Sequence, residues 1–132
     1  MMEINDELLR TLFAEAEVSE RRRMNYDLRT SAADGSQRML NALLPGTEIP
    51  VHRHPKSNEN VFLLVGRMDE VIYEETGERG LREKVRFHLC PAEGRYGCVV
   101  PAGAWHSVEV LEPSVIYEAK DGKYGEDGSE RW

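Results

Sequence analysis

The chain has 132 residues, 40% of them hydrophobic and 31% charged, which is the balance of one soluble folded domain and excludes an intrinsically disordered chain. Its 24 acidic and 17 basic residues give a formal net charge of −7, which argues against nucleic acid as a partner because two polyanions repel each other. No apolar run reaches membrane-spanning length, residues 1–13 lack the basic start of a signal peptide, and two cysteines cannot form a disulfide framework. We therefore expect a cytoplasmic protein with no membrane insertion.

The first predicted element is a helix from about Asp6 to Glu17. Asn5 can cap it, because a side-chain oxygen at that position accepts a hydrogen bond from a free backbone N–H. Apolar residues recur at helical spacing and form a single stripe, made of Leu8, Leu9, Leu12, Phe13 and Ala16. We expect this stripe to pack the helix across the rest of the fold.

From residue 23 onward the sequence changes to short strand-like runs separated by turn residues. The runs cover 23–29, 37–44, 48–54, 59–65, 67–75, 81–89, 98–101, 105–111 and 114–119. Gly66 separates two of them and is interpreted as the turn of a hairpin. Many short strands with Gly and Pro turns and one helix predict an all-β fold, either a barrel or a double-sheet jelly roll. The barrel is expected to be filled by Phe62, Leu64, Val71, Tyr73 and Val99.

Two histidines stand one residue apart, shortly before the most apolar run of the chain. Side chains on a strand alternate between faces, so His52 and His54 project to the same side, about 7 Å apart along the strand, and both rings can converge on one ion. Glu59 follows a tight turn, at the start of the neighbouring strand, and can face the same interior. Imidazole nitrogens with a carboxylate oxygen suit Zn, Fe, Mn, Ni or Cu rather than Ca or Mg.

A third histidine opens a later strand, after the turn that Pro101 and Gly103 predict. His106 shares one strand face with Val108 and Val110 in this reading. Three histidines and one glutamate leave one or two positions open on a five- or six-coordinate metal, and an open position is typical of a catalytic site. The sequence thus predicts one divalent transition metal, Zn, Fe, Mn or Ni, with the ligands His52, His54, Glu59 and His106.

These two segments match the motifs of a known superfamily. The first reads Gly46–x5–His52–x–His54–x4–Glu59–x6–Gly66, which matches the first cupin motif at every fixed position. The second reads Pro101–x–Gly103–x2–His106, which matches the core of the second cupin motif. The chain therefore resembles the cupin superfamily. The resemblance implies a small double-stranded β-helix, or jelly-roll barrel, here with one N-terminal helix.

The second motif departs from the superfamily at two positions, neither of which is a ligand. Arg95 stands in place of its leading glycine and Val110 in place of its terminal asparagine. Residues 36–46, the His-x-His segment at 52–54, and residues 101–111 and 115–125 also resemble the WbuC-type cupin-fold metalloproteins, which are found with bacterial surface-polysaccharide biosynthesis. This narrower resemblance runs over roughly residues 23 to 124.

We expect residues 1–132 to form a single cupin domain. Its N-terminal helical segment covers 1–20, its barrel 21–120 and its polar, Gly-rich tail 121–132. The tail is interpreted either as a strap over the barrel or as a loose end.

Further polar residues are candidates for contacts with a substrate. Arg38 and Asn41 precede the metal strand and are candidate substrate-binding residues, since an arginine can grip a carboxylate or phosphate. Tyr117 and Glu118 are candidate catalytic residues, as a general acid or base near the metal. The two members of each pair have opposite strand parity, so only one of each can face inward. His88 has no partner motif and is expected at the surface or beside a ligand.

The leading hypothesis is a metal-dependent enzyme that acts on a small polar molecule. The WbuC-type setting implies a sugar or nucleotide-sugar, with isomerase- or epimerase-like chemistry beside a carbonyl. An iron-dependent oxygenase fits the same ligands. The alternative from another class is a non-catalytic, metal-dependent binding module, or a subunit of a polysaccharide-synthesis complex. A homodimer is also expected, because such barrels have sheet edges to protect.

Overall fold

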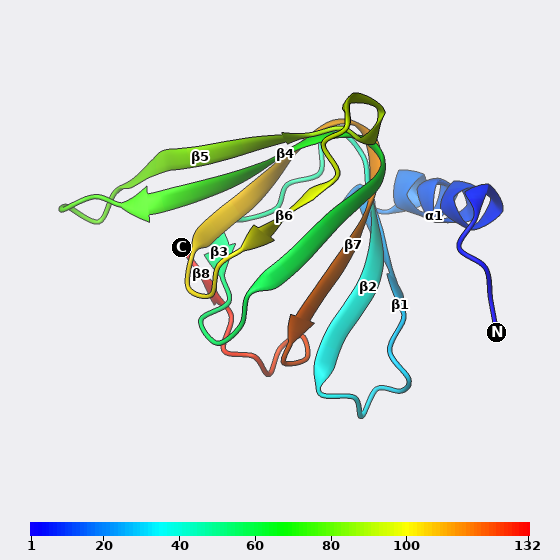
Figure 1. The fold of residues 1–132 in the computed structure, drawn as a ribbon, viewed down its shortest axis with the longest axis horizontal. Helices are drawn as coiled ribbons and strands as arrows, with labels where there is room; N and C mark the ends of the chain where they lie inside the picture. The colour runs from blue at the N-terminus through cyan, green and yellow to red at the C-terminus, as the bar shows by residue number, and fades with distance from the viewer.

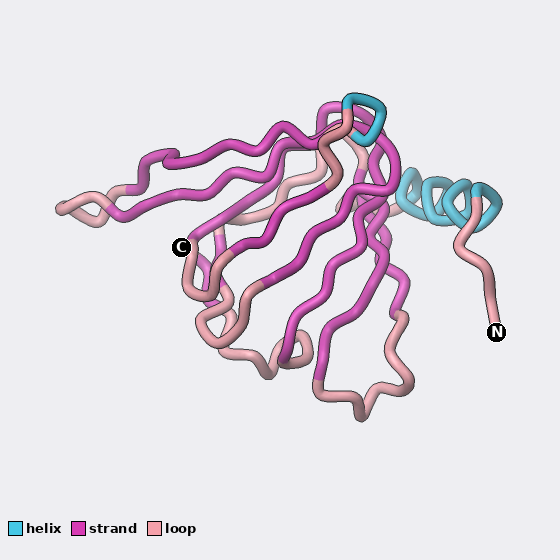
Figure 2. Tube along the Cα trace, viewed as in Figure 1, coloured by secondary structure: helices cyan, strands magenta, loops and turns pink.

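The N-terminal helix lies against the outside of an antiparallel β structure in the computed structural model, which describes residues 1–132 (Figures 1 and 2). This helix, α1 (Asp6–Val18), begins at the predicted residue, and the side chain of Asn5 accepts a hydrogen bond of 3.0 Å from the N–H of Leu8. Its apolar stripe packs on a sheet face, in a cluster built on Leu12, Ala16, Leu40, Ala42, Leu44 and Val115. Neither this helix nor the later helical turn has the length and apolar character needed to span a membrane.

The strands form two layers and pair antiparallel throughout (Figure 1). One layer contains β1 (Arg23–Asp27), β2 (Ser36–Leu43), β6 (Gly97–Val100), the first part of β4 (Glu59–Glu75) and the second part of β7 (Trp105–Asp121). The other layer contains β3 (His52–Arg53), β5 (Leu81–Leu89), β8 (Glu130–Arg131) and the remaining parts of β4 and β7. A 3₁₀ turn, η1 (Pro91–Glu93), lies between β5 and β6.

The two long strands, β4 and β7, run through both layers and bend at the same place. Gly66, with φ +103°, lies inside β4, so the expected hairpin turn between residues 59–65 and 67–75 is wrong. A Cβ atom on this glycine would lie 2.3 Å from the carbonyl oxygen of Pro113 on β7. The pairing register of the two strands shifts around this position, as at a β-bulge. Glycine therefore lets one continuous strand turn from one layer into the other.

The space between the layers is filled from positions that alternate along the strands. The interior cluster consists of Leu43, Val61, Leu63, Met68, Ile72, Leu89, Val100 and Ile116. Phe62, Leu64 and Val99, which were expected to fill the barrel, instead lie on the outer face and are 51%, 42% and 55% exposed. The reason is strand parity, because the residues on either side of Phe62 face inward. Val71 is buried and Tyr73 half-buried, both outside the interior cluster.

The C-terminal tail is a strap rather than a loose end. Its strand β8 pairs with β3, and an ion pair of 2.6 Å joins Arg53 to Glu130. The N–H of Trp132 donates a hydrogen bond of 3.0 Å to the carbonyl of Val51. The ring of Trp132 packs edge-on against Trp105, with 5.1 Å between the ring centroids. The end of the chain is thus attached to the strand that carries the first histidine of the His-x-His pair.

Candidate metal centre

Three histidine rings meet where β3 pairs with β7. His52 on β3 and His106 on β7 are direct cross-strand partners, with 4.2 Å between their ring centroids. The ring of His54, just after β3, lies 4.9 Å from that of His52 and 5.2 Å from that of His106. The candidate ligand nitrogens of the three rings all lie within 4.8 Å of one another. The run at 48–54 contributes only the two residues of β3, since Pro50 has no N–H to extend the ladder.

The carboxylate of Glu59 faces the same point from the start of β4. Its Oε2 lies 3.0 Å from Nε2 of His54 and its Oε1 lies 3.9 Å from Nε2 of His106. Both of these nitrogens are buried and have no hydrogen-bond partner, so the 3.0 Å contact lacks hydrogen-bond geometry. Buried polar atoms normally find a partner. Unpartnered nitrogens facing a carboxylate are the arrangement that a bound cation satisfies.

The other nitrogen of each ring is held by an acceptor. Nδ1 of His52 lies 2.8 Å from the carbonyl oxygen of Pro50, and Nδ1 of His106 lies 2.9 Å from that of Ala104. A carbonyl only accepts, so it fixes the proton on Nδ1 and leaves the lone pair on Nε2. Hydrogen bonds of this kind orient imidazoles that bind metals. The rings are therefore held in the tautomer that presents Nε2 to the centre.

Burial favours the neutral form of His52 and His106, and the surrounding rings favour the charged form of the carboxylate. Desolvation lowers the pKa of His106 to about 4, and the neighbouring charge of His52 adds to the effect. Desolvation also lowers the pKa of His52. For Glu59, burial acts to raise the pKa, but the contact with His54 and the charges of the three rings when protonated hold it below the usual value. Neutral imidazole and ionised carboxylate are the forms that bind a metal.

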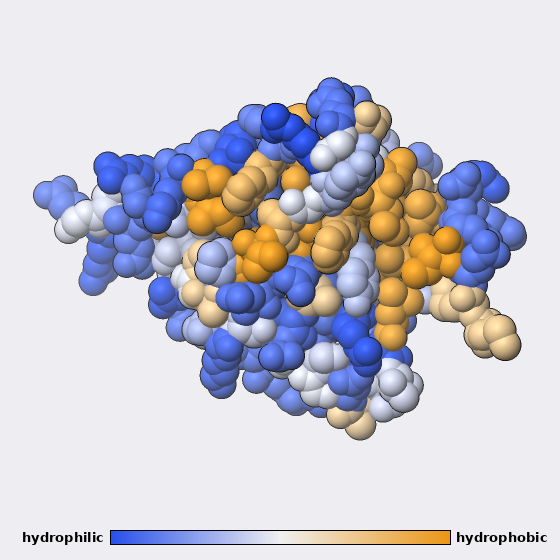
Figure 3. Space-filling model, viewed as in Figure 1, coloured by the Kyte–Doolittle hydropathy of each residue, from blue (hydrophilic) through white to orange (hydrophobic).

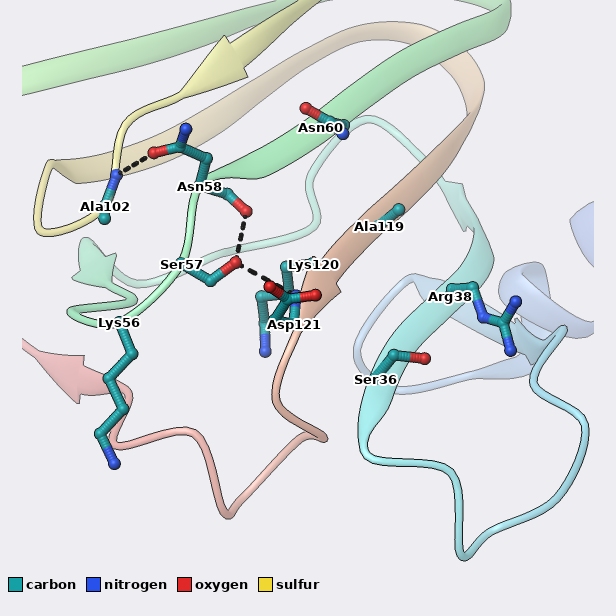
Figure 4. Close-up of a pocket in the computed structure, with 10 residues that line it drawn as sticks. All are labelled: Ser36, Arg38, Lys56, Ser57, Asn58, Asn60, Ala102, Ala119, Lys120 and Asp121. Atoms are coloured by element: carbon teal, nitrogen blue, oxygen red, sulfur yellow. Dashed lines mark hydrogen bonds between the residues drawn. The ribbon is translucent and has the colours of Figure 1, made fainter.

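Hydrogen bonds between neighbouring turns hold the turn between His54 and Glu59 in place (Figure 4). The side-chain oxygen of Asn58 accepts a hydrogen bond of 2.8 Å from the N–H of Ala102. The N–H of Gly103 donates one of 2.9 Å to the carbonyl of His54. The turn that carries two ligand candidates is thus tied to the turn that precedes His106. The donor set as a whole, three imidazoles and one carboxylate, fits a divalent transition metal.

A family model described as a domain of unknown function, DUF6016, matches residues 4–87. The chain belongs to the DUF6016 family. No curated protein sequence matches it. The match covers α1, β4 and three of the four metal-centre residues described above, whereas His106 lies beyond it.

Solved structures with the same fold include three that cover most of this DUF6016 chain. The capsular polysaccharide assembling protein CapF from Staphylococcus aureus matches with a TM-score of 0.64 and 15% identity, over 86% of this chain and 32% of CapF. An oxalate oxidase in complex with the substrate analogue glycolate matches with a TM-score of 0.60 and 15% identity, over 86% of this chain and 57% of the oxidase. A formate complex of the Lactobacillus farciminis oxalate decarboxylase matches with a TM-score of 0.56 and 18% identity, over 83% of this chain and 30% of the decarboxylase. This chain spans between about a third and just over half of their lengths. The similarity shows that the DUF6016 chain has the cupin jelly-roll fold, as its motifs predict.

Of the other candidate residues, Glu118 and Asn41 face the interior of the DUF6016 barrel. Glu118 on β7 is the cross-strand partner of Val61 on β4, which belongs to the interior cluster. The amide nitrogen of Asn41 donates a long hydrogen bond of 3.4 Å to the carboxylate of Glu118. Desolvation, together with the negative charge of Glu59, raises the pKa of Glu118 to about 8. The side-chain oxygen of Asn41 is buried and has no partner. A carboxyl that gains or loses a proton near neutral pH therefore lies in the interior.

Arg38 and Tyr117 lie on the opposite, outer face, so Asn41 and Glu118 are the inward members of the two pairs. Arg38 forms an ion pair with Asp34 and lines a polar surface pocket of about 560 Å³ (Figure 4). Tyr117 packs against the cluster under α1. Both follow from parity, since Leu40 and Val115 of that cluster are two residues away on the same strands. His88 is at the surface, where its Nδ1 lies 2.8 Å from a carboxylate oxygen of Asp69.

Two groups near the metal centre were not predicted from the sequence. Glu70 is buried, and desolvation, with the charges of Glu59 and Glu118, raises its pKa well above the usual value. It stands between Met68 and Ile72 of the interior cluster, and this period-two pattern is the signal that could have placed it inside. The second group comes from the tail and consists of the buried Asp127 and its exposed hydrogen-bond partner Ser129. No pattern in the sequence indicates the burial of Asp127.

Proposed function

We propose that the protein binds one divalent transition metal through His52, His54, Glu59 and His106. The observation that carries the proposal is the pair of buried, unpartnered Nε2 atoms that face the carboxylate of Glu59. The acceptors on Nδ1 support it, because they keep the lone pairs turned to one point. The donor set suits Zn, Fe, Mn or Ni, and metal analysis is the measurement that separates them.

We further propose that the protein is a metal-dependent enzyme for a small polar molecule, a sugar or nucleotide-sugar of bacterial surface-polysaccharide biosynthesis. A metal with open positions polarises a substrate oxygen or lowers the pKa of bound water. Glu118 would give or take a proton, a role that its raised pKa supports. Asn41 would orient that carboxyl through their hydrogen bond. Isomerisation or epimerisation beside a carbonyl uses these parts.

The substrate class rests on the resemblance to the WbuC-type proteins, which is part of the proposal. CapF, a capsular polysaccharide assembling protein, has the same fold and is compatible with that setting. An iron-dependent oxygenase uses the same ligands and differs in its metal and in its need for oxygen.

The first test is elemental analysis of protein purified without added metal, for wild type and His52→Ala. We expect about one divalent transition metal per wild-type chain and a loss of metal in the variant. Wild-type protein that takes up no Zn²⁺, Mn²⁺, Fe²⁺ or Ni²⁺ would contradict the metal site. Iron with oxygen consumption on addition of a sugar would favour the oxygenase.

The second test is turnover of a panel of nucleotide-sugars, followed by NMR. We expect Glu118→Gln to lower kcat about 100-fold or more, as the loss of a general acid–base group does. Glu112→Gln is the matched control, since Glu112 is exposed on the same strand and remote from the interior. Tight binding of a nucleotide-sugar without turnover would instead identify a binding module.

We also propose a homodimer, formed through the outer face of β4 and β6. Hydrophobic side chains gather across this side of the molecule (Figure 3), and the exposed large residues of these two strands include Phe62, Leu64 and Val99. Burial of such a face stabilises association of a second copy. Sedimentation analysis of wild type and Phe62→Asp tests this, and a monomeric wild type would refute it.

A further inference from the structure

The tail contains one buried carboxylate among exposed residues. Asp127 is 5% exposed, whereas Glu126 and Gly128 on either side of it are exposed. Its Oδ2 accepts hydrogen bonds of 2.5 Å from Nζ of Lys120 and 2.6 Å from the hydroxyl of Ser129, and its Oδ1 accepts one of 3.1 Å from the N–H of Ser129. A buried charge is costly unless it is paired and hydrogen-bonded, and this one is both. One of its partners is the buried ammonium of Lys120, and the other is Ser129, which leads to the metal centre.

This carboxylate is connected to one ring of the metal centre. Nδ1 of His54 lies 2.7 Å from the hydroxyl oxygen of Ser129 and 3.3 Å from Oδ2 of Asp127. The hydroxyl proton of Ser129 points to Asp127, so its oxygen is left to accept the proton on Nδ1 of His54. The proton chain runs from the imidazole through the serine to the carboxylate. It leaves the Nε2 lone pair of His54 turned to the centre.

The other two rings do not depend on the tail in this way. His52 and His106 are each held by a backbone carbonyl two residues earlier in the chain, at Pro50 and Ala104. Such contacts are local and form wherever their own turn forms. His54 has a side-chain acceptor 75 residues away in sequence. The tautomer of His54 is therefore the one that depends on how the C-terminal tail is docked.

The seat of the tail is specific. β8 pairs with β3, directly beside His52, and Trp132 packs on Trp105. A Cβ atom on Gly122 would lie 2.9 Å from the Cβ of Asp127, so the chain turns tightly back on itself at this glycine and Asp127 lies close beside it.

We propose that Asp127, acting through Ser129, is a positioning residue for His54, and that docking of residues 122–132 and metal binding strengthen each other. The inference rests on the proposed metal site and names its regulation. A carboxylate on the far side of a ligating imidazole fixes its tautomer and raises its basicity. Coupling between two binding events is reciprocal, so a metal that favours the oriented ring also favours the docked tail.

The test measures Zn²⁺ affinity by competition with a chelator, for wild type, Ser129→Ala, Asp127→Asn and the control Asp121→Asn. Asp121 undergoes the same chemical change but is exposed. We expect Zn²⁺ to bind about 10–100-fold more weakly to Ser129→Ala and Asp127→Asn, and unchanged to Asp121→Asn. Ser129→Ala leaves the Lys120–Asp127 pair intact, so it stays informative if Asp127→Asn, which leaves the buried lysine unpaired, fails to fold.

The reciprocal arm measures hydrogen exchange of the tail in wild-type protein. We expect Zn²⁺ to slow exchange of the amide of Trp132, which donates to Val51, and to do so less in Ser129→Ala. Wild-type affinity in both Ser129→Ala and Asp127→Asn, or exchange at Trp132 that Zn²⁺ does not change, overturns the inference. His52→Ala separates the two proposals. If this substitution abolishes Zn²⁺ binding, the proposed metal site stands, whatever affinity the tail variants have.

Discussion

Replacement of Gly66 by alanine tests the bend that places the two layers around the metal centre. The added Cβ would lie 2.3 Å from the carbonyl oxygen of Pro113 and 2.4 Å from the hydroxyl of Ser114. Ser114 is fully buried, accepts a hydrogen bond of 3.2 Å from the N–H of Arg67 and donates one of 2.7 Å to the carbonyl of Glu112. The hydroxyl of Ser114 cannot rotate away without breaking these bonds, and the carbonyl of Pro113 is part of the backbone. The strands must therefore separate at the bend.

Two costs add in this variant. A side chain at the φ of +103° costs about 1–2 kcal/mol of folding free energy, because alanine avoids that region. Overpacking at a tight contact costs about 1–3 kcal/mol more. Gly46→Ala is the matched control, since Gly46 has φ +93° but no atom within 4 Å of its added Cβ. The control should lose only the first, conformational cost.

Urea unfolding followed by circular dichroism measures both variants against wild type. We expect Gly66→Ala to lose about 2–5 kcal/mol of unfolding free energy and Gly46→Ala about 1–2 kcal/mol. The difference between the two isolates the close approach of β4 and β7. Equal losses in both variants would refute the packing argument and leave only the backbone term.

Three further outcomes follow from the core, the buried acid and the metal centre. Leu12→Ala should lower the unfolding free energy by about 2–5 kcal/mol in the same assay, because Leu12 is buried between α1 and the sheet. Glu15→Ala, an exposed change on the same helix, is the control, and an equal loss in both variants would contradict this packing. Glu70 has a raised folded-state pKa, so its contribution to stability is complete below the unfolded pKa near 4.5 and is lost as pH rises. Measured with chelator present, Glu70→Gln should therefore gain stability relative to wild type between pH 5 and pH 8, and a constant difference across that range would count against its burial as a free acid. Added Zn²⁺ should raise the melting temperature of wild type by mass action and leave that of His106→Ala unchanged, as scanning calorimetry can show.

The arrangement of the metal centre was largely readable from local spacing. Alternation along a strand places His52 and His54 on one side, and a tight turn returns Glu59 to the same side. The structure brings the three rings together with that carboxylate, while their role as ligands stays a prediction. Such short-range patterns depend only on backbone geometry, which is why they survive without knowledge of the fold.

The facing of the next strand was harder to predict because both of its faces are apolar. In the run from Glu59 to Val65, hydrophobicity alone cannot separate inward from outward positions. The parity of Glu59 itself decides, since an inward carboxylate puts Val61 and Leu63 inside and Phe62 outside. The register shifts around Gly66 reverse this parity, so the inward positions beyond the bend are Met68, Glu70 and Ile72, and the parity of Glu59 alone would have placed Glu70 outside.

Long-range contacts of polar segments could not be predicted from the sequence. Asp127 stands in a Gly-rich, charged tail with the composition of a loose end. Its burial results from three partners, Lys120, Ser129 and His54, one of which is far away in sequence. No periodicity signals such a contact. Only the fold brings the end of the chain back to β3.

The strap has a practical consequence for the handling of this protein. The C-terminus lies beside β3 and the histidines, whereas the N-terminus projects from α1 on the far side of the molecule (Figure 1). An affinity tag fused after Trp132 would crowd the packing on Trp105 and, if made of histidines, would offer rival imidazoles next to the native ones. A tag placed before Met1, where the chain is exposed, leaves the seat of the strap intact. Metal content measured with a C-terminal tag would therefore report on the tag as much as on the protein.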